Sequence, residues 1–249
     1  KYFKHFNLSK LPESKVALVK ALYQINDKES LLAQLDKHIK NKEVHPLIGS
    51  VVSRTNRRYK ISNRNYFCES PFDFVQTIDL NEICDFSDTF VKSANQILND
   101  ATTNYTAQTL LTNARQTAGN IFFLRPDIVN KIEVLLREQI ETYRQRFEDS
   151  QEGLIQNWPK NYTLFGWFLK MDTGGEIAAH MHEKGWISGS VYINVPPKEG
   201  RDDGNLVVCI EDDRGNGENK APHKIIDVVT GSLALFPASL LHYTIPFKS

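Results

Sequence analysis

Three of the seven histidines stand in a pattern that could bind a metal ion. His180 and His182 are two positions apart, and His242 follows further along the chain. In a β-strand, residues two apart project to the same face, so His180 and His182 would project together while Met181 points to the other side. Three imidazoles that meet at one point can hold a metal ion and leave coordination positions open for chemistry.

The residues around these histidines predict strands that would bring them together. Residues 186–195 are rich in β-branched and aromatic side chains, which favour a strand. Residues 232–236 form a second apolar run, opened by a Thr-Gly turn signal and closed by Pro237. His242 lies just past that run, where we expect extended structure to resume. Two ligands from one strand and one from a distant strand would place the metal at the mouth of a β-barrel.

The sequence limits the metals that could bind but does not identify one. Imidazole suits iron, zinc, copper and nickel, and three histidines with a zinc-bound water could catalyse hydrolysis. A His-X-His pair by itself is commonly a pair of ordinary polar residues, so the prediction depends on the third histidine. The cysteines are scattered and form no Cys-X-X-Cys pair, which argues against a structural zinc site; they are Cys68, Cys84 and Cys209.

From Gly166 onward the chain resembles the iron(II)- and 2-oxoglutarate-dependent oxygenases. The similarity is to the branch with a His-X-His motif, then Ser-Gly-Ser-Val-Tyr, then Gly-X-Leu-X-Leu-Phe-Pro and a distal histidine. Here those elements are residues 180–182, 188–192, 231–237 and His242, and Asp203-Gly204-Asn205-Leu206 matches the glycine-led strand between them. The resemblance covers about the last third of the chain.

The resemblance implies a double-stranded β-helix, or jelly roll. It also implies Fe(II) held by His180, His182 and His242, with 2-oxoglutarate and O₂ as cosubstrates. The reaction would decarboxylate 2-oxoglutarate to succinate and CO₂ while hydroxylating a substrate. Most of the superfamily has Asp or Glu as the second ligand, so Glu183 is an alternative to His182 if the strand is bulged. The strand period of two favours His182.

The same resemblance implies where the cosubstrate would bind. Tyr192 aligns with a strand position that in relatives donates to the distal carboxylate of 2-oxoglutarate; its alternative role is that of an aromatic core residue. Ser188 and Asn194 share the strand face of Tyr192, because both lie an even number of positions away. We therefore expect these three side chains to contact the cosubstrate.

The family's usual second anchor for 2-oxoglutarate is an Arg or Lys on the strand after the distal histidine. After His242 this sequence has Lys248 as its basic residue, which leads to the expectation that further C-terminal sequence supplies the anchor. Arg115 and Arg125 are the reserve candidates, since a guanidinium pairs with a carboxylate through two hydrogen bonds.

Composition limits the remaining function classes. The chain has 249 residues, 41% of them hydrophobic, which is enough for a sizeable core. Its 30 basic and 30 acidic residues give no net field, which argues against a general binder of nucleic acid or of anionic membranes. No apolar run approaches the length of a membrane span, and no signal-like leader opens the sequence. The scattered cysteines fit a reducing compartment, so a cytoplasmic location is expected.

The predicted fold class is α+β, with a mostly β core, N-terminal helices and a bracing helix. Residues 1–100 are predicted as a helical region and 101–249 as the jelly-roll domain. Two helices are expected near the N-terminus, the second capped by Asn26 and carrying an apolar stripe through Leu31, Leu32, Leu35 and Ile39. A longer helix should start at Pro126 and brace the barrel, with these residues on its inner face: Ile128, Val129, Ile132, Leu135, Leu136, Ile140 and Tyr143.

Two polar regions carry alternative interpretations. A basic cluster interleaved with tyrosines would be a solvated loop, a nucleic-acid patch or a site for an acidic substrate; its basic members are Arg54, Arg57, Arg58, Lys60 and Arg64. The glycine-rich stretch 198–222 would be a substrate lid or an exposed hairpin near the barrel mouth. Among the aromatic residues, Trp167, Trp186 and Phe168 could line the metal pocket, with core packing expected for at least two of them.

Two other classes of protein share these features. A cupin-like enzyme with three histidines would not use 2-oxoglutarate and would need no carboxylate anchor. A binding module without catalysis would use a degenerate barrel and the helices to hold a partner. Protein side chains, peptides and small molecules all stay open as substrates, and the sequence leaves the oligomeric state open.

Overall fold

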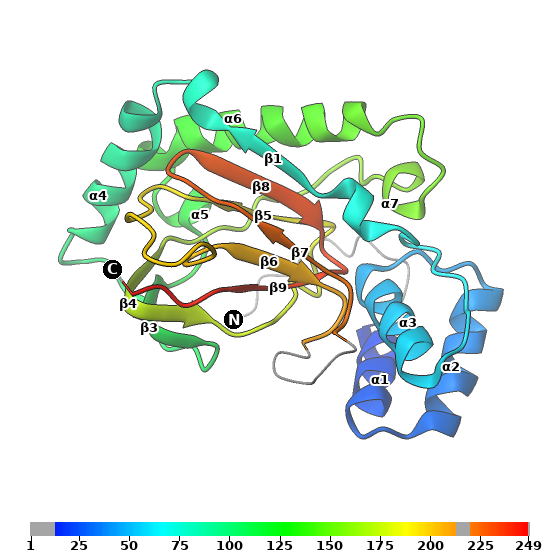
Figure 1. Cartoon of the computed structure of the whole chain (residues 1–249). Helices are drawn as coiled ribbons and strands as arrows, with labels where there is room; N and C mark the ends of the chain where they lie inside the picture. Colours follow the sequence, from blue (N-terminus) through cyan, green and yellow to red (C-terminus); the bar gives the residue numbers. More distant parts are fainter. Residues whose placement is uncertain (1–12, 213–219, 249) are drawn as a thin grey trace.

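The computed structural model describes residues 13–212 and 220–248. Within them the strands form three antiparallel three-stranded sheets, in the orders β1-β8-β5, β2-β3-β4 and β7-β6-β9. The strands are β1 (Gln76–Asp79), β2 (Tyr105–Thr106), β3 (Leu111–Thr117), β4 (Leu169–Ile177), β5 (Ile187–Val191), β6 (Leu206–Cys209), β7 (His223–Ile226), β8 (Ser232–Pro237) and β9 (Leu241–Thr244). Figure 1 shows the sheets on one side of the molecule and the first three helices at its other end.

Backbone hydrogen bonds join two of these sheets edge to edge. Beyond the end of β4, the amide of His180 donates to the carbonyl of His242 (3.1 Å), and the amide of His242 donates back to the carbonyl of His180 (2.8 Å). Within β4, Gly174 N–H donates to the carbonyl of Phe247 at 2.7 Å. The sheets β2-β3-β4 and β7-β6-β9 therefore form one layer, and β1-β8-β5 forms a second.

The two layers enclose an apolar cluster that we call the inner cluster. Its buried members are Leu206, Val208, Ile226, Val228, Ala234, Phe236 and Leu240. Alternate residues of β8 separate to opposite faces, as the strand period requires: Ala234 and Phe236 face this cluster, whereas Leu233 and Leu235 pack on the other side. The mixed α+β class with antiparallel sheets is confirmed, and a closed jelly roll stays a prediction.

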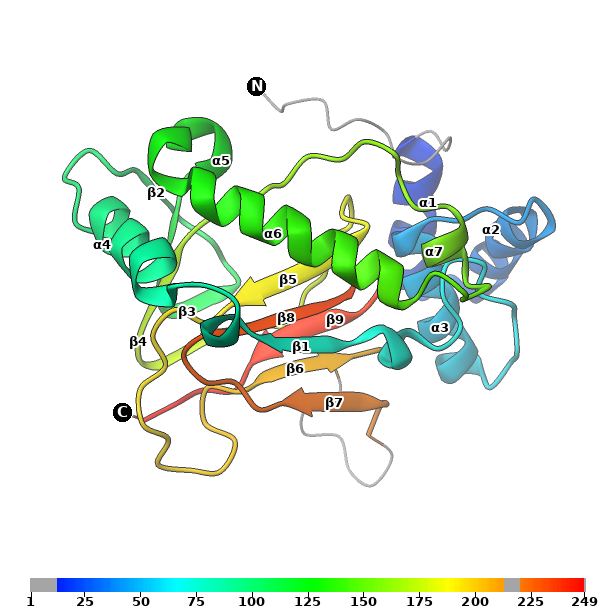
Figure 2. The ribbon, with the colours of Figure 1, turned by 90° about the horizontal axis from the view of Figure 1, so that it is seen from above.

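The bracing helix is confirmed as α6 (Pro126–Arg146), with Pro126 in its first turn. Val129 and Tyr143 are completely buried against the outer face of the β1-β8-β5 sheet, in the cluster that contains Leu233 and Leu235. Figure 2 shows α6 lying across this sheet. The neighbouring short elements are α4 (Lys92–Leu98), α5 (Ile121–Leu124), α7 (Gly153–Gln156), the 3-10 turns Pro71–Phe74 and Leu80–Glu82, and the π-helical turn Ser87–Val91. None of the helices in the described ranges combines the length and the apolar character needed to cross a membrane.

The N-terminal helices are three rather than two: α1 (Glu13–Gln24), α2 (Lys28–Lys40) and α3 (Pro46–Tyr59). They share their own apolar core, which we call the helical cluster; its buried members are Val16, Val19, Leu22, Tyr23, Leu31, Leu35, Leu47, Ile48, Val51 and Val52. The predicted cap of α2 is wrong by one position: Asn26 has a left-handed backbone (φ 57°), and the Asp27 carboxylate accepts from Ser30 N–H.

Three further expectations change with the structure. Much of the basic cluster belongs to α3, so it is not a loop. The stretch 198–222 is not simply an exposed excursion, because β6 within it is fully buried; residues 213–219 lie outside the described residues. Within the range expected to be helical, β1 joins the sheet of β8 with Gln76 opposite Leu235.

Candidate metal centre

The three histidines come from two neighbouring extended segments. His180 forms a bridge with His242, which lies in β9, and His182 follows beyond the paired residues. The expectation of one regular strand through His180 and His182 is wrong, since β4 ends at Ile177. The chain nevertheless stays extended, and Met181 packs on the opposite side, in the helical cluster. The strand-like alternation thus projects both imidazoles toward the same point.

The imidazoles converge closely. The ring centroids of His180 and His242 are 4.2 Å apart, those of His182 and His242 are 5.0 Å apart, and those of His180 and His182 are 5.1 Å apart. Each ring offers one nitrogen such that these three atoms lie within 4.8 Å of one another. His242 is buried, while His180 and His182 are partly accessible, so the centre is reached from the side of the His-Met-His segment.

Burial keeps the three rings neutral. It lowers the pKa of His182 to about 4, with a further contribution from His180, and it lowers the pKa of His180. The pKa of His242 falls well below its usual value through burial and through its two histidine neighbours. Neutral imidazoles are the protonation state that binds metals.

Hydrogen bonding also prepares these rings for a metal. Nδ1 of neutral His180 is placed to donate to the carbonyl of Ala178 at 2.9 Å, which would leave Nε2 as the metal-binding atom. Nδ1 of His242 is buried and has no hydrogen-bond partner among the described residues. Three neutral nitrogen donors, one of them on a ring with an unpaired buried atom, fit a first-row transition metal.

The structure distinguishes the two candidates for the second ligand. Glu183 pairs with Lys20 of α1 at 2.6 Å and is not part of the converging group, whereas His182 is. The motif does not predict this ion pair, because Lys20 belongs to a helix that is far away in the sequence. The geometry therefore supports His182.

Aromatic side chains border the centre. The ring of Trp167 meets His182 edge-on, with centroids 5.3 Å apart, and Phe236 lies 5.1 Å from His242. Trp186 is in the core, where its indole N–H donates to the carbonyl of Leu154 at 2.8 Å, and Phe168 is also in the core. Of the three aromatic residues considered, two pack in the core and Trp167 lies at the histidines. The sequence analysis did not single out Phe236 as a neighbour, although it lies in the Phe-Pro motif.

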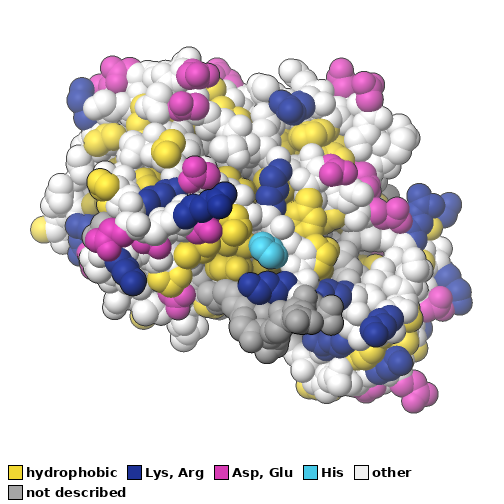
Figure 3. Space-filling view, in the orientation of Figure 1, with side chains coloured by type: hydrophobic (Ala, Val, Ile, Leu, Met, Phe, Trp, Pro, Cys, Tyr) yellow, Lys and Arg dark blue, Asp and Glu magenta, His cyan; other side chains and the backbone are white. Residues whose placement is uncertain are grey.

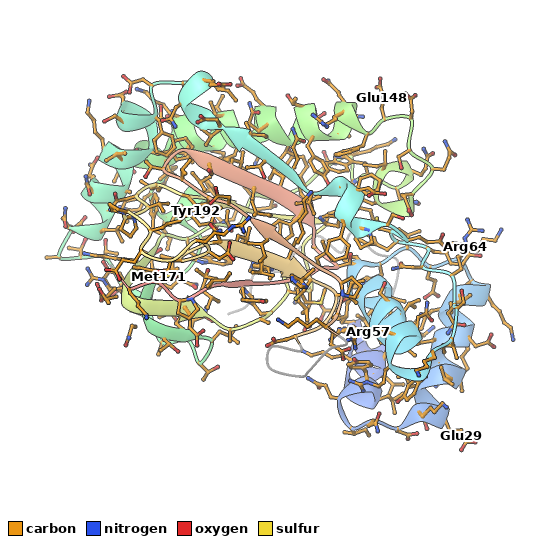
Figure 4. All side chains as sticks on the ribbon, viewed as in Figure 1. Glu29, Arg57, Arg64, Glu148, Met171 and Tyr192 are labelled. Atoms are coloured by element: carbon orange, nitrogen blue, oxygen red, sulfur yellow. The ribbon has the colours of Figure 1, made fainter. Side chains whose placement is uncertain are left out.

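Two of the expected cosubstrate residues face the interior between the layers. Ser188 lies opposite Phe236 in the β5–β8 ladder, so the two side chains share a face. Its hydroxyl is buried without a hydrogen-bond partner among the described residues. Tyr192, just after β5, packs against the inner cluster, and burial raises the pKa of its phenol. Asn194 is exposed. Figure 4 labels Tyr192 among the sheets.

The reserve anchors lie in other environments. Arg115 is on the exposed side of β3, where its guanidinium stacks over the ring of Tyr105 at 4.8 Å. Arg125 forms an ion pair with Asp100. Lys248 is exposed.

Comparison with known proteins bears on the same region. No curated protein matches the chain. Residues 166–249 match the model of a family described as "Putative 2OG-Fe(II) oxygenase". The matched segment runs from β4 to β9 and contains all three converging histidines. Over this last third, the chain is therefore similar to the 2-oxoglutarate- and iron(II)-dependent oxygenases, as its motif predicted.

Proposed function

We propose that this protein is an Fe(II)- and 2-oxoglutarate-dependent oxygenase that hydroxylates a substrate through a three-histidine centre. One observation carries the proposal: His180, His182 and His242 converge within 4.8 Å inside the segment that matches the oxygenase family. A closed jelly roll would hold the centre at its mouth, consistent with the two packed layers.

The side chains have separate roles in this proposal. The three imidazoles hold Fe(II), and Fe(II) with 2-oxoglutarate supplies the oxidising chemistry when both are bound. Tyr192 and Ser188 are placed to donate hydrogen bonds to 2-oxoglutarate from the interior face. Trp167 and Phe236 border the imidazoles with apolar rings and so restrict the access of water. With His182 in place of a carboxylate, the ligand set carries no negative charge, which makes the centre one unit more positive.

The test is an anaerobic titration with Fe(II) and 2-oxoglutarate, followed by measurement of succinate on addition of O₂ in the absence of substrate. The expected result is saturable Fe(II) binding and slow succinate release, both lost in His180→Ala and His242→Ala. His223→Ala is the matched control, because His223 is an exposed histidine in β7, outside the cluster. Iron binding without succinate in the full chain would contradict the use of 2-oxoglutarate.

A second candidate follows from one observation. The two reserve anchors are engaged elsewhere, since Arg115 stacks over Tyr105 and Arg125 pairs with Asp100, and a carboxylate cosubstrate ordinarily needs a cationic anchor. A cupin-like three-histidine enzyme that works without 2-oxoglutarate requires none. The succinate measurement separates the two, since this candidate binds metal and releases no succinate.

A further inference from the structure

His182 is the ligand with the least support from the sheets. His180 and His242 hold each other through two backbone hydrogen bonds, and the ring of His180 bonds to Ala178. His182 lies beyond this pairing; its carbonyl accepts from Gly185 N–H at 2.8 Å, and no hydrogen bond of its ring is found among the described residues. Something other than the sheet must therefore fix its position.

The neighbouring residue Met181 points the other way, into the N-terminal helices. Met181 is partly buried and packs against the helical cluster, and of the described residues that do so it alone lies outside α1, α2 and α3. A methionine side chain is flexible enough to fill an irregular gap between helices. Because consecutive side chains of an extended segment point to opposite sides, seating Met181 in this cluster aims His182 back toward the metal centre.

Ion pairs accompany this contact. Glu183 pairs with Lys20 at 2.6 Å, and Lys184 pairs with Glu13 at 3.3 Å. Both pairs are substantially exposed, so each contributes little by itself. Both pairs link the segment to α1 just after the partly buried Met181 contact.

A second contact ties the helices to Glu211, two residues past the end of β6. The hydroxyl of Tyr23 donates to Glu211 at 2.5 Å, and Arg57 and Arg58 each approach the same carboxylate at 3.4 Å. The guanidinium of Arg58 stacks on the Tyr23 ring at 3.7 Å. Figure 4 shows Arg57 on the side of the helices nearest the sheets, and Figure 3 shows Lys and Arg side chains gathered over the same helices. The basic residues of α3 thus dock the helices against the sheet region.

We propose that helices α1–α3 act as a brace for the metal centre, with Met181 as the positioning residue that orients His182. The inference rests on the proposed metal centre and goes beyond it, because these helices lie outside the segment that matches the oxygenase family. Residues that orient metal ligands typically affect metal affinity by about tenfold to a hundredfold. Met181→Ala should therefore weaken metal binding by about that factor while His182 itself is unchanged.

The experiment titrates the full chain with Co(II) under anaerobic conditions and records both the dissociation constant and the visible absorption spectrum. Met181→Ala is expected to raise the Kd about tenfold or more and to alter the spectrum. Met181→Leu, which conserves volume, should restore both. Ile97→Ala is the matched control: Ile97 is 1% exposed in the core beside α6, so its truncation destabilises the fold at a distance from the histidines.

The outcomes separate this inference from the proposed function. If wild type binds Co(II) and Met181→Ala binds it with the same Kd and spectrum, the brace is refuted and the metal centre stands. Equal weakening by Ile97→Ala would refute it too, because general destabilisation would then explain the effect. Failure of the wild type to bind Co(II) would overturn the metal centre itself. If Met181→Ala does not fold, the smaller truncation Met181→Val takes its place, with a weaker loss of affinity in the same direction.

Discussion

Replacement of Ser188 by alanine should stabilise the protein without cosubstrate and weaken the binding of 2-oxoglutarate. The Ser188 hydroxyl is buried, faces the interior beside Phe236, and has no hydrogen-bond partner among the described residues. A buried hydroxyl without a partner is unfavourable, whereas a hydroxyl that donates to a bound carboxylate is favourable. The substitution should therefore stabilise the protein without cosubstrate and destabilise its complex with 2-oxoglutarate.

The magnitudes follow from the burial of this hydroxyl. Burying an unpaired hydroxyl costs roughly 1–3 kcal/mol, and Ser→Ala removes one oxygen without a large cavity, so we expect a gain of about 1 kcal/mol in the free energy of unfolding. For a chain of this length that gain raises the Tm by about 2–4 °C. A hydrogen bond to a charged group contributes about 1.5–3 kcal/mol, which corresponds to roughly a tenfold to hundredfold weaker Kd for 2-oxoglutarate.

The assay is thermal unfolding of Ser188→Ala and wild type, each with and without Fe(II) and 2-oxoglutarate. Ser190→Ala is the control, because Ser190 is on the same face of β5, opposite Ala234, but is partly exposed. It should leave the Tm nearly unchanged. A lower Tm for Ser188→Ala without ligand would refute the argument from the unpaired hydroxyl. An unchanged affinity for 2-oxoglutarate would remove Ser188 from the cosubstrate site.

Three further predictions concern stability. His45 caps α3 by accepting Leu47 N–H on Nδ1, and burial, with His38 nearby, lowers its pKa to about 4. Wild type should therefore lose stability as the pH falls from about 6.5 toward 4. His45→Asn still caps the helix, so its free energy of unfolding, measured with urea, should fall by about 2 kcal/mol less than that of wild type between pH 6.5 and 5. The same pH dependence in both proteins would contradict this prediction. Tyr143→Phe removes a 2.7 Å hydrogen bond to a buried backbone carbonyl and should cost about 1–3 kcal/mol in the same assay. Gly231→Ala should lower the Tm, since the residue has φ 96° and a Cβ would lie 2.0 Å from a neighbouring side chain; an unchanged Tm would refute the strain.

The shared direction of His180 and His182 could be predicted because the strand period decides which side chains share a face. That rule needs no regular hydrogen-bonded strand, so it held for His180 and His182 although β4 ends before them. The choice between His182 and Glu183 depends also on Lys20, which is far away in the sequence and reaches Glu183 only after folding. A short sequence motif does not predict such long-range contacts.

Helix α3 was missed because its basic residues suggested a solvated loop. Arg57 and Arg58 follow Arg54 by three and four positions, so both lie next to Arg54 on the helix surface. Arg54 and Arg58 lie over the ring of Tyr23, and their aliphatic stems can cover apolar surface while the guanidinium of Arg58 reaches Glu211. From composition alone, arginines are expected to be solvent-exposed. Whether they pack against other residues depends on which helix lies next to them in the fold.

Strand β6 was indicated only by the family motif Asp203-Gly204-Asn205-Leu206, and not by the local composition. It is four residues long and lies in a stretch rich in Gly and charged residues, which by itself favours a loop. Its residues are fully buried because β7 and β9 pair with it on both sides, with Val208 opposite His242. A short strand in the centre of a sheet depends on its neighbours, which the local pattern does not contain.

The segment that matches the oxygenase family packs against elements outside its range. Within it, β8 exposes Leu233 and Leu235 on its outer face, and α6, outside the matched range, covers them. The edge of β8 is likewise paired by β1, also outside the range. The His-Met-His segment depends on the N-terminal helices in the same way, through Met181. The family match therefore covers the segment that contains the three histidines, while elements in the first two thirds of the chain pack against its strands and against the His-Met-His segment.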